Sequence, residues 1–134
     1  MANIRDIEGI GEGYATKLEA IGIKTEEKLL EMGGSKKGRE TIADSAGVSE
    51  KLVLEWVNRA DLSRIKGVGS EYADLLEAAG VDSVPELAAR RADNLTKKMT
   101  EINEAKNLVR RVPTENEVTG WIEHAKSLES AVAH

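Results

Sequence analysis

The chain has 134 residues, of which 40% are hydrophobic and 32% charged, a balance typical of a globular protein with one compact domain or two very small ones. Its net charge of −5 argues against a protein that wraps nucleic acid by electrostatic attraction alone. The absence of cysteine excludes disulfides, a thiolate nucleophile and a cysteine-based zinc site. No stretch approaches the roughly 18 apolar residues of a membrane span, and the first residues lack a signal-peptide pattern. We therefore expect a cytoplasmic protein without a membrane partner.

The first recognisable element is the stretch IEGIGEGYATKLEAIGI at residues 7–23. Gly9 can take the left-handed backbone conformation needed where a chain reverses, and Gly11 can open the helix that follows. Ile10, between them, is free to enter the core. Ala15 provides the small side chain needed where two helices cross. The pattern predicts two helices joined by a Gly-hydrophobic-Gly turn.

Residues 41–60, TIADSAGVSEKLVLEWVNRA, have the apolar and glycine spacing of a helix-turn-helix. The turn falls at Gly47, and Ser49 is a potential N-cap of the second helix, which turns Val53 and Trp56 inward. The polar face of that helix is poor in groups that read a DNA groove. Two interpretations remain open: a DNA-reading helix-turn-helix, or a helical corner that follows the same packing rule.

The stretch IKGVGSEYADLLEAAGV at residues 65–81 repeats the first stretch 58 residues later. The similarity resumes near the end of each half, where Trp56 matches Trp121. These matches predict a duplicated unit of about sixty residues, packed with its copy into one pseudo-symmetric, all-α domain with a shared core. The expected halves are residues 1–61 and residues 62–134, the second including a C-terminal helix. The matching pairs of the two stretches are Ile7/Ile65, Gly9/Gly67, Gly11/Gly69, Tyr14/Tyr72, Ala15/Ala73, Leu18/Leu76, Glu19/Glu77, Ala20/Ala78 and Gly22/Gly80.

Two later helices begin with capping signals, Ser83 with Glu86 and Thr114 with Glu117, each of which predicts a capping box. Between these helix starts, the segment 86–113 has seven basic and four acidic residues and is the clearly basic part of the chain. Such mixed charge is usually a solvated helix face. Its basic residues include Arg90, Arg91, Lys97, Lys98, Arg110 and Arg111.

Both Gly-hydrophobic-Gly stretches resemble the helix-hairpin-helix motif, as IRDIEGIGEGYATKL and LSRIKGVGSEYADLL show. Over most of its length the chain also resembles the bacterial domain-of-unknown-function 4332 family, including the block EWVNRADLSRIKGVGSEYADLLEAAGVDSV. The helix-hairpin-helix resemblance implies sequence-independent DNA binding, in which backbone N–H groups of the turn and of the next helix hold a phosphate. Glycines allow the close approach, and a helix N-terminus favours an anion.

The two turns differ in charge. Glu8 and Glu12 flank the first turn (residues 8–12) and oppose a phosphate, whereas Lys66 and Ser70 flank the second turn (residues 66–70) and favour one. We therefore expect weak, sequence-independent DNA binding, mainly through the second turn and basic residues that the fold brings beside it. The candidate nucleic-acid-binding residues are Lys66, Gly67, Val68, Gly69, Ser70, Gly9, Ile10, Gly11, Arg90 and Arg91.

The alternative is a protein-interaction or self-association module that keeps the fold without the DNA role. Catalysis finds little support, because His124 beside Glu117 and Glu123 is typical of a surface helix and no Walker loop is present. We expect no catalytic residues, no metal and no cofactor. The expected partners are DNA, another protein or a second copy of the chain.

Overall fold

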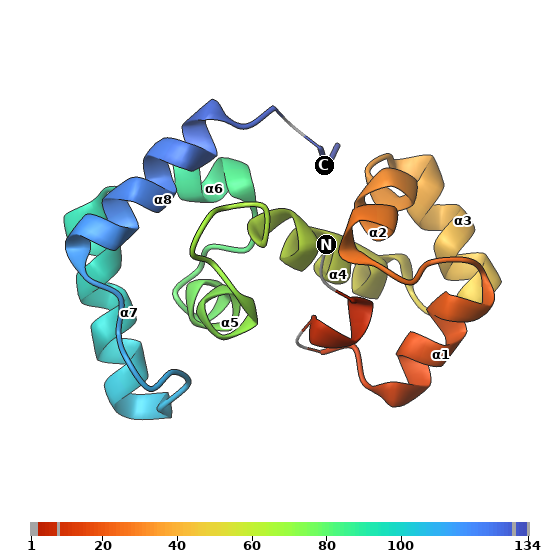
Figure 1. The fold of residues 1–134 in the computed structure, drawn as a ribbon, viewed down its shortest axis with the longest axis horizontal. Coiled ribbons are helices and arrows are strands. Elements are labelled where there is room, and N and C mark those ends of the chain that lie inside the picture. The colour runs from red at the N-terminus through yellow and green to blue at the C-terminus, as the bar shows by residue number, and fades with distance from the viewer. Residues whose placement is uncertain (1–2, 8, 130, 134) are drawn as a thin grey trace. The chain divides into compact units, whose positions relative to one another are not determined.

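The computed structural model of the chain describes residues 3–7, 9–129 and 131–133, apart from the side chain of Ser70. These residues form one short 3-10 helix and eight α-helices, and among them no strand occurs (Figure 1). An isolated bridge pairs Asn3 with Thr25. The predicted all-α fold is confirmed.

The helices are arranged in two compact units. Unit 1 comprises Met1–Asp61 with Ser130–His134, and unit 2 comprises Leu62–Glu129. The elements in chain order are η1 (Ile4–Asp6), α1 (Glu12–Ala20), α2 (Glu26–Gly33), α3 (Lys36–Ala46), α4 (Glu50–Leu62), α5 (Ser70–Ala78), α6 (Val84–Ala88), α7 (Ala92–Lys106) and α8 (Glu115–Ser127).

In unit 1, α3 packs against both α1 and α2. Hydroxyl side chains cap α2 and α3, because Thr25 accepts from the Lys28 N–H at 3.1 Å and Ser35 accepts from the Gly38 N–H at 3.0 Å. Helix α3 ends at Gly47, whose φ of +71° lies in the left-handed region that a C-terminal glycine supplies. The segment 41–60 thus forms parts of two helices separated by a turn at Gly47, and both interpretations of it remain open.

The segment 131–133 completes unit 1, although it follows all of unit 2 along the chain. The Val132 side chain is buried with the apolar residues of unit 1, and the Ala133 N–H donates to the Gly34 carbonyl at 2.8 Å. The buried Arg39 guanidinium donates to the carbonyls of Gly34 and Ala133. A Cβ on Gly34 would lie 2.5 Å from the Ala131 carbonyl oxygen, so glycine is what allows the segment to approach so closely.

In unit 2, α8 packs against α6 and α7, and α5 packs against α7 (Figure 1). The predicted capping box at the start of α8 is present: the Glu117 N–H donates to Thr114 Oγ1 and the Thr114 N–H donates to Glu117 Oε1. At the start of α6 the Ser83 hydroxyl accepts from the Glu86 N–H at 3.3 Å, but the Glu86 carboxylate lies 3.9 Å from Arg90. The box predicted there is therefore only half formed.

The buried apolar residues form one cluster in each unit. Trp56, Leu18 and Leu29 belong to the cluster of unit 1, and Trp121 and Leu76 to that of unit 2. The internal repeat led us to expect a core shared by two halves, because sixty residues alone bury little surface. Each unit instead has its own cluster, and unit 1 enlarges its cluster with Val132. The expected burial of Trp56 and Trp121 is confirmed, at 2% and 4% exposure.

The backbone of the two Gly-hydrophobic-Gly stretches follows the same hydrogen-bond pattern. In unit 1 the Ile10 N–H donates to the Ile7 carbonyl at 3.2 Å. In unit 2 the Val68 N–H donates to the Ile65 carbonyl at 3.0 Å. The glycines that follow α1 and α5 are also alike, since Gly22 has φ of +90° and Gly80 has φ of +93°. These features make the two turns directly comparable.

Candidate nucleic-acid interface

The second turn reverses the chain between α4 and α5. Gly67 has φ of +93°, a conformation that side chains with a Cβ rarely adopt. Val68 is buried, as the sequence pattern predicts. Gly69 is the N-cap of α5, and its φ of −96° and ψ of −172° are extended values open to any residue. Only the first glycine of the turn is therefore required by backbone conformation.

Several backbone donors of the second turn have no acceptor among the residues that the structure describes. The N–H groups of Gly67, Gly69 and Glu71 bond to nothing in the described part of the chain, and no side chain caps α5. Lys66 is exposed and forms no ion pair with a described residue. Unpaired N–H groups at a helix start carry partial positive charge. The side chain of Ser70 lies outside the described residues, so its predicted role remains a prediction.

The first turn has the same backbone but different charges. Gly9 has φ of +92°, Ile10 is buried and Gly11 is the N-cap of α1. Glu8, predicted to oppose a phosphate here, lies outside the described residues. The Glu12 carboxylate pairs with Arg5 at 2.7 Å, so this cation offsets the negative charge that the sequence places beside the turn.

Arg5, which lies in η1, also donates from its Nη2 to Oε1 of Glu19 in α1, at 2.7 Å. Both hydrogen bonds raise the pKa of the Arg5 guanidinium, and the bond to Glu19 has the larger effect. The same bond to Arg5 lowers the pKa of the Glu19 carboxyl. The first turn is thus bordered by one cation that is already paired with two carboxylates, which leaves little attraction for an anion.

Arg90 lies at the other end of α5 from the second turn. Its Nη2 donates to the Gly80 carbonyl at 3.1 Å, and a Cβ on Gly80 would lie 3.2 Å from the same nitrogen. Gly80 follows the C-terminus of α5, whereas the second turn precedes its N-terminus. A helix of this length separates its two ends by about 13 Å. Arg90 therefore holds the end of α5 where carbonyls are exposed, and its contact does not reach the turn.

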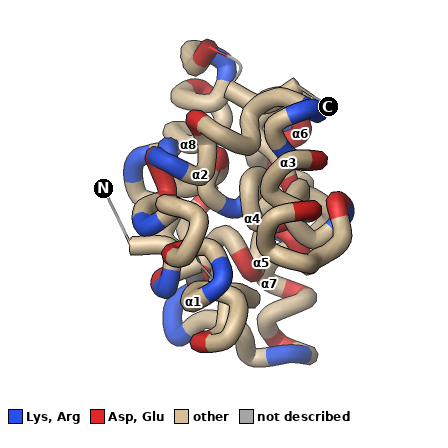
Figure 2. Tube along the Cα trace, turned by 90° about the vertical axis from the view of Figure 1, so that its right-hand side faces the viewer, with Lys and Arg blue, Asp and Glu red and all other residues tan. Residues whose placement is uncertain are grey.

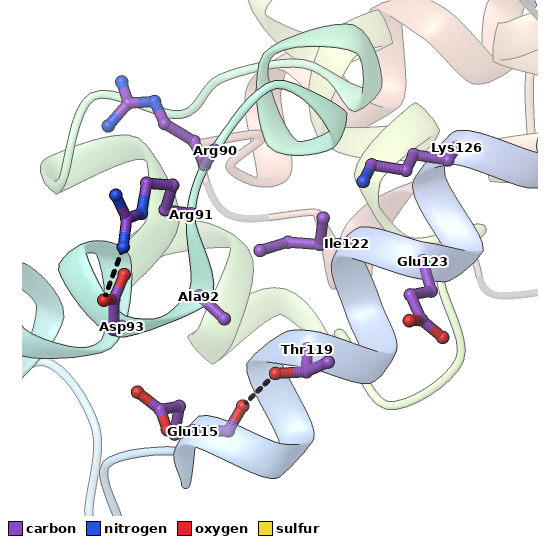
Figure 3. A pocket seen from close by; sticks show the side chains of 9 residues that line it. All are labelled: Arg90, Arg91, Ala92, Asp93, Glu115, Thr119, Ile122, Glu123 and Lys126. Carbon is purple, nitrogen blue, oxygen red and sulfur yellow. Dashed lines mark hydrogen bonds and ion pairs between the residues drawn. The ribbon is translucent and has the colours of Figure 1, made fainter.

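Arg91 lines a groove of about 450 Å³ between the start of α7 and α8 (Figure 3). There it pairs with Asp93 at 3.1 Å. The pKa of the Asp93 carboxyl is lowered, mainly by the hydrogen bond from the Asn94 N–H and next by the bond from Arg91. Thr119 and Lys126 line this groove from α8.

The residues of α8 that adjoin Lys66 and Gly67 are different ones, among them Gly120 and His124. Successive residues of an α-helix are rotated by about 100° around its axis. Gly120 and His124 therefore lie on a largely different side of α8 from Thr119 and Lys126. The structure therefore does not bring Arg91 together with the second turn.

Five residues beside the second turn were not predicted as site residues from the sequence. The Lys66 N–H donates to Nδ1 of His124 at 3.1 Å, although the two residues are 58 positions apart. The same groove, of about 540 Å³, is lined by Asn116, Glu117, Gly120 and Trp121. We call it the turn groove; its lining is Lys66, Gly67, Asn116, Glu117, Gly120, Trp121 and His124. No local spacing indicates this arrangement, because it depends on how α8 packs against the turn.

Glu117 is the carboxylate of the turn groove, and its charge is paired. Arg111 donates to both of its oxygens, at 2.7 and 2.9 Å. These bonds, followed by the bond from the Thr114 N–H, lower the pKa of Glu117 to about 2, and Glu117 raises the pKa of Arg111. The Arg111 carbonyl accepts from the Tyr72 hydroxyl at 2.9 Å, which ties this loop to α5. The carboxylate is thus ionised and balanced rather than free to repel an anion.

Charges of both signs are interspersed along the trace (Figure 2). Among the described residues, no helix has the length and apolar character needed to cross a bilayer.

The described residues define an all-α protein with two Gly-hydrophobic-Gly turns, one of which has backbone donors beside a lysine that bond to no described acceptor. The model of a family described as a domain of unknown function, DUF4332, matches residues 8–128. The chain therefore belongs to this family. Comparisons with curated proteins and with solved structures gave no match.

Proposed function

We propose that unit 2 binds the phosphate backbone of DNA, without regard to sequence, through the second turn. The observation that carries this proposal is the set of N–H groups at Gly67, Gly69 and Glu71, which have no acceptor among the described residues. They border the exposed Lys66, which pairs with no described carboxylate. Backbone donors at a helix start hold an anion without a specific side chain, and a lysine adds attraction. Contacts of this kind position a protein on DNA but carry no base information.

We further infer that the chain contains a duplicated unit, of which one copy keeps the phosphate site. The two turns share their left-handed glycine, their buried apolar residue and their N-cap glycine. Tyr14 packs on Trp56 with ring centroids 5.1 Å apart, and Tyr72 packs on Trp121 at 5.2 Å. The two turns differ in their charges, because the first turn is bordered by Arg5 paired with Glu12 and Glu19. This difference supports a phosphate-binding role for the second turn alone.

The direct test is the charge reversal Lys66→Glu, measured by fluorescence anisotropy with a labelled DNA at low salt. We expect the affinity to fall about tenfold, the size of a partly exposed charge contact on the order of 1 kcal/mol. The matched control is Lys126→Glu, which makes the same charge change in unit 2 but on the opposite side of α8. Lys66 is exposed, so the melting temperature should change little.

Equal effects of the two variants would contradict a site at the second turn and indicate diffuse attraction. If the parent protein binds no DNA at low salt but forms oligomers that depend on concentration, or retains a protein partner, the interaction-module alternative is favoured instead. In the proposed role the chain is a binding module and not an enzyme.

A further inference from the structure

The turn groove contains a donor that the proposed phosphate site does not use. The Trp121 side chain is 4% exposed and packs against Tyr72, so most of its ring is unavailable. Its Nε1 would lie 3.0 Å from a Cβ on Gly67, which places the indole N–H at the wall of the turn groove. This N–H donates to no described group. The ring is buried while its N–H lines the groove, so an acceptor supplied by a ligand in the groove can bond to it.

Gly120 keeps the turn groove open. It lies in the interior of α8, where glycine is the least favourable residue apart from proline. Its φ is not positive, and a Cβ placed on it would meet no atom within 4 Å. Neither backbone conformation nor packing therefore requires a glycine at this position. A larger side chain here would extend over the groove that Gly120 lines.

The remaining polar groups of the turn groove also favour a ligand with hydrogen-bond acceptors. Nδ1 of His124 accepts from the Lys66 N–H, so a neutral imidazole carries its proton on Nε2 and is a donor there. Asn116 supplies an amide, which both donates and accepts. Glu117 is already bonded to Arg111. The groove thus combines an apolar wall with several donors and one adaptable amide.

We propose that the turn groove takes the base of an unpaired nucleotide whose phosphate is held at the second turn, so that the preferred ligand is single-stranded nucleic acid. This inference rests on the proposed function, because Lys66 and Gly67 belong to both the turn and the groove. One nucleotide joins a phosphate to a flat ring through a sugar, and can therefore occupy the two neighbouring sites together.

The chemistry of the bases fits the groove without selecting one of them. Every base has a ring nitrogen or carbonyl oxygen that can accept from the Trp121 N–H. In a duplex the bases are paired and stacked, so a base enters the groove only after unpairing. The preference should therefore be for single strands over duplexes, with little dependence on sequence.

The test compares three labelled ligands of equal length at low salt: a mixed-sequence single strand, a single strand made of abasic sites, and a duplex. The abasic strand keeps the phosphates and removes the bases. We expect the full protein to bind the normal strand on the order of tenfold more tightly than the abasic strand, the scale of one base contact. Gly120→Leu should remove this difference and leave binding of the abasic strand unchanged. Gly120→Ala is the control for helix propensity and should keep most of the difference.

The outcomes separate the two proposals. The base site is overturned if the parent binds the normal and abasic strands equally. It is also overturned if the affinity difference between these strands persists in Gly120→Leu. In both cases the phosphate site stands. No binding of any of the three ligands overturns the proposed function and the base site with it. If Gly120→Leu changes only the self-association of the chain, measured by sedimentation, the groove takes protein and the inference is wrong. A melting temperature of Gly120→Leu at or above that of the parent shows that the variant folds.

Discussion

At the scale of single residues, the two glycines of the second turn have different roles. Gly67 is held at φ of +93°, and a Cβ on it would press on the Trp121 indole nitrogen. Gly69 has an extended backbone and open space around it. A serine at position 69 would suit an N-cap better, but its hydroxyl would accept from an N–H group of α5. Glycine at position 69 therefore leaves those N–H groups available to an external anion.

Glu117 gives a prediction about pH. Its carboxyl has a pKa of about 2 in the folded protein, against an ordinary value of 4.5. A carboxyl whose pKa is lowered by folding stabilises the fold above its unfolded pKa, and this contribution is lost as the pH falls toward the folded value. We expect Glu117→Gln to melt below the parent at pH 7, with the difference shrinking between about pH 4.5 and pH 2.

The measurement is the melting temperature of both proteins across that pH range. Glutamine can still accept from the Thr114 N–H, so the comparison isolates the charge paired with Arg111. The side chains of Arg111 and Glu117 are partly exposed, so the difference should shrink further in high salt. A constant difference from pH 7 to pH 2 would contradict the account.

At the scale of elements, the segment 131–133 is predicted to stabilise α2 and α3. Val132→Ala removes buried methyl groups from the cluster of unit 1, which should lower the free energy of unfolding by about 1–2 kcal/mol. Hydrogen exchange is the suitable measurement, since it reports each helix separately. We expect faster exchange in α2 and α3.

An exposed substitution on α8, Lys126→Ala, serves as the control for this prediction and should leave exchange in α2 and α3 unchanged. Unchanged exchange in α2 and α3 of Val132→Ala would show that the segment is not part of their stable packing.

The elements also show what the sequence can predict. Ile10, Val68, Trp56 and Trp121 were expected to be buried, because each conclusion rests on spacing within one helix or turn. The helix starts at Thr114 and Ser49 were predictable for the same reason.

The arrangement around the second turn could not be predicted. Arg90 bonds to Gly80, ten residues away, and His124 to Lys66, 58 residues away. Both contacts depend on how helices pack, which a local pattern does not contain. The docking of Val132 in unit 1 has no sequence signal either, since one valine among small and polar residues is typical of a loop.

At the scale of the whole molecule, the acidic net charge should limit the strength of the proposed DNA binding. Each phosphate neutralised contributes a slope of about −0.9 to the plot of log affinity against log salt. With cations dispersed among carboxylates (Figure 2), we expect a shallow slope between about −1 and −2 for the parent. Lys66→Glu should reduce its magnitude by about 1.

Anisotropy titrations at several salt concentrations measure this slope. A slope steeper than about −4 would require a cationic surface larger than the second turn provides, and would contradict the proposed site.

The position of residues 131–133 also affects the order in which the protein folds during synthesis. Domains usually fold in the order in which they leave the ribosome, beginning at the N-terminus. Here the apolar cluster of unit 2 is complete once residue 129 has emerged, whereas unit 1 still lacks Val132 and the Ala133 carbonyl that Arg39 binds. The first unit to be translated is therefore the last to be finished, and a nascent chain that has emerged only as far as residue 129 would have a completed unit 2 and a unit 1 with an open site in its core.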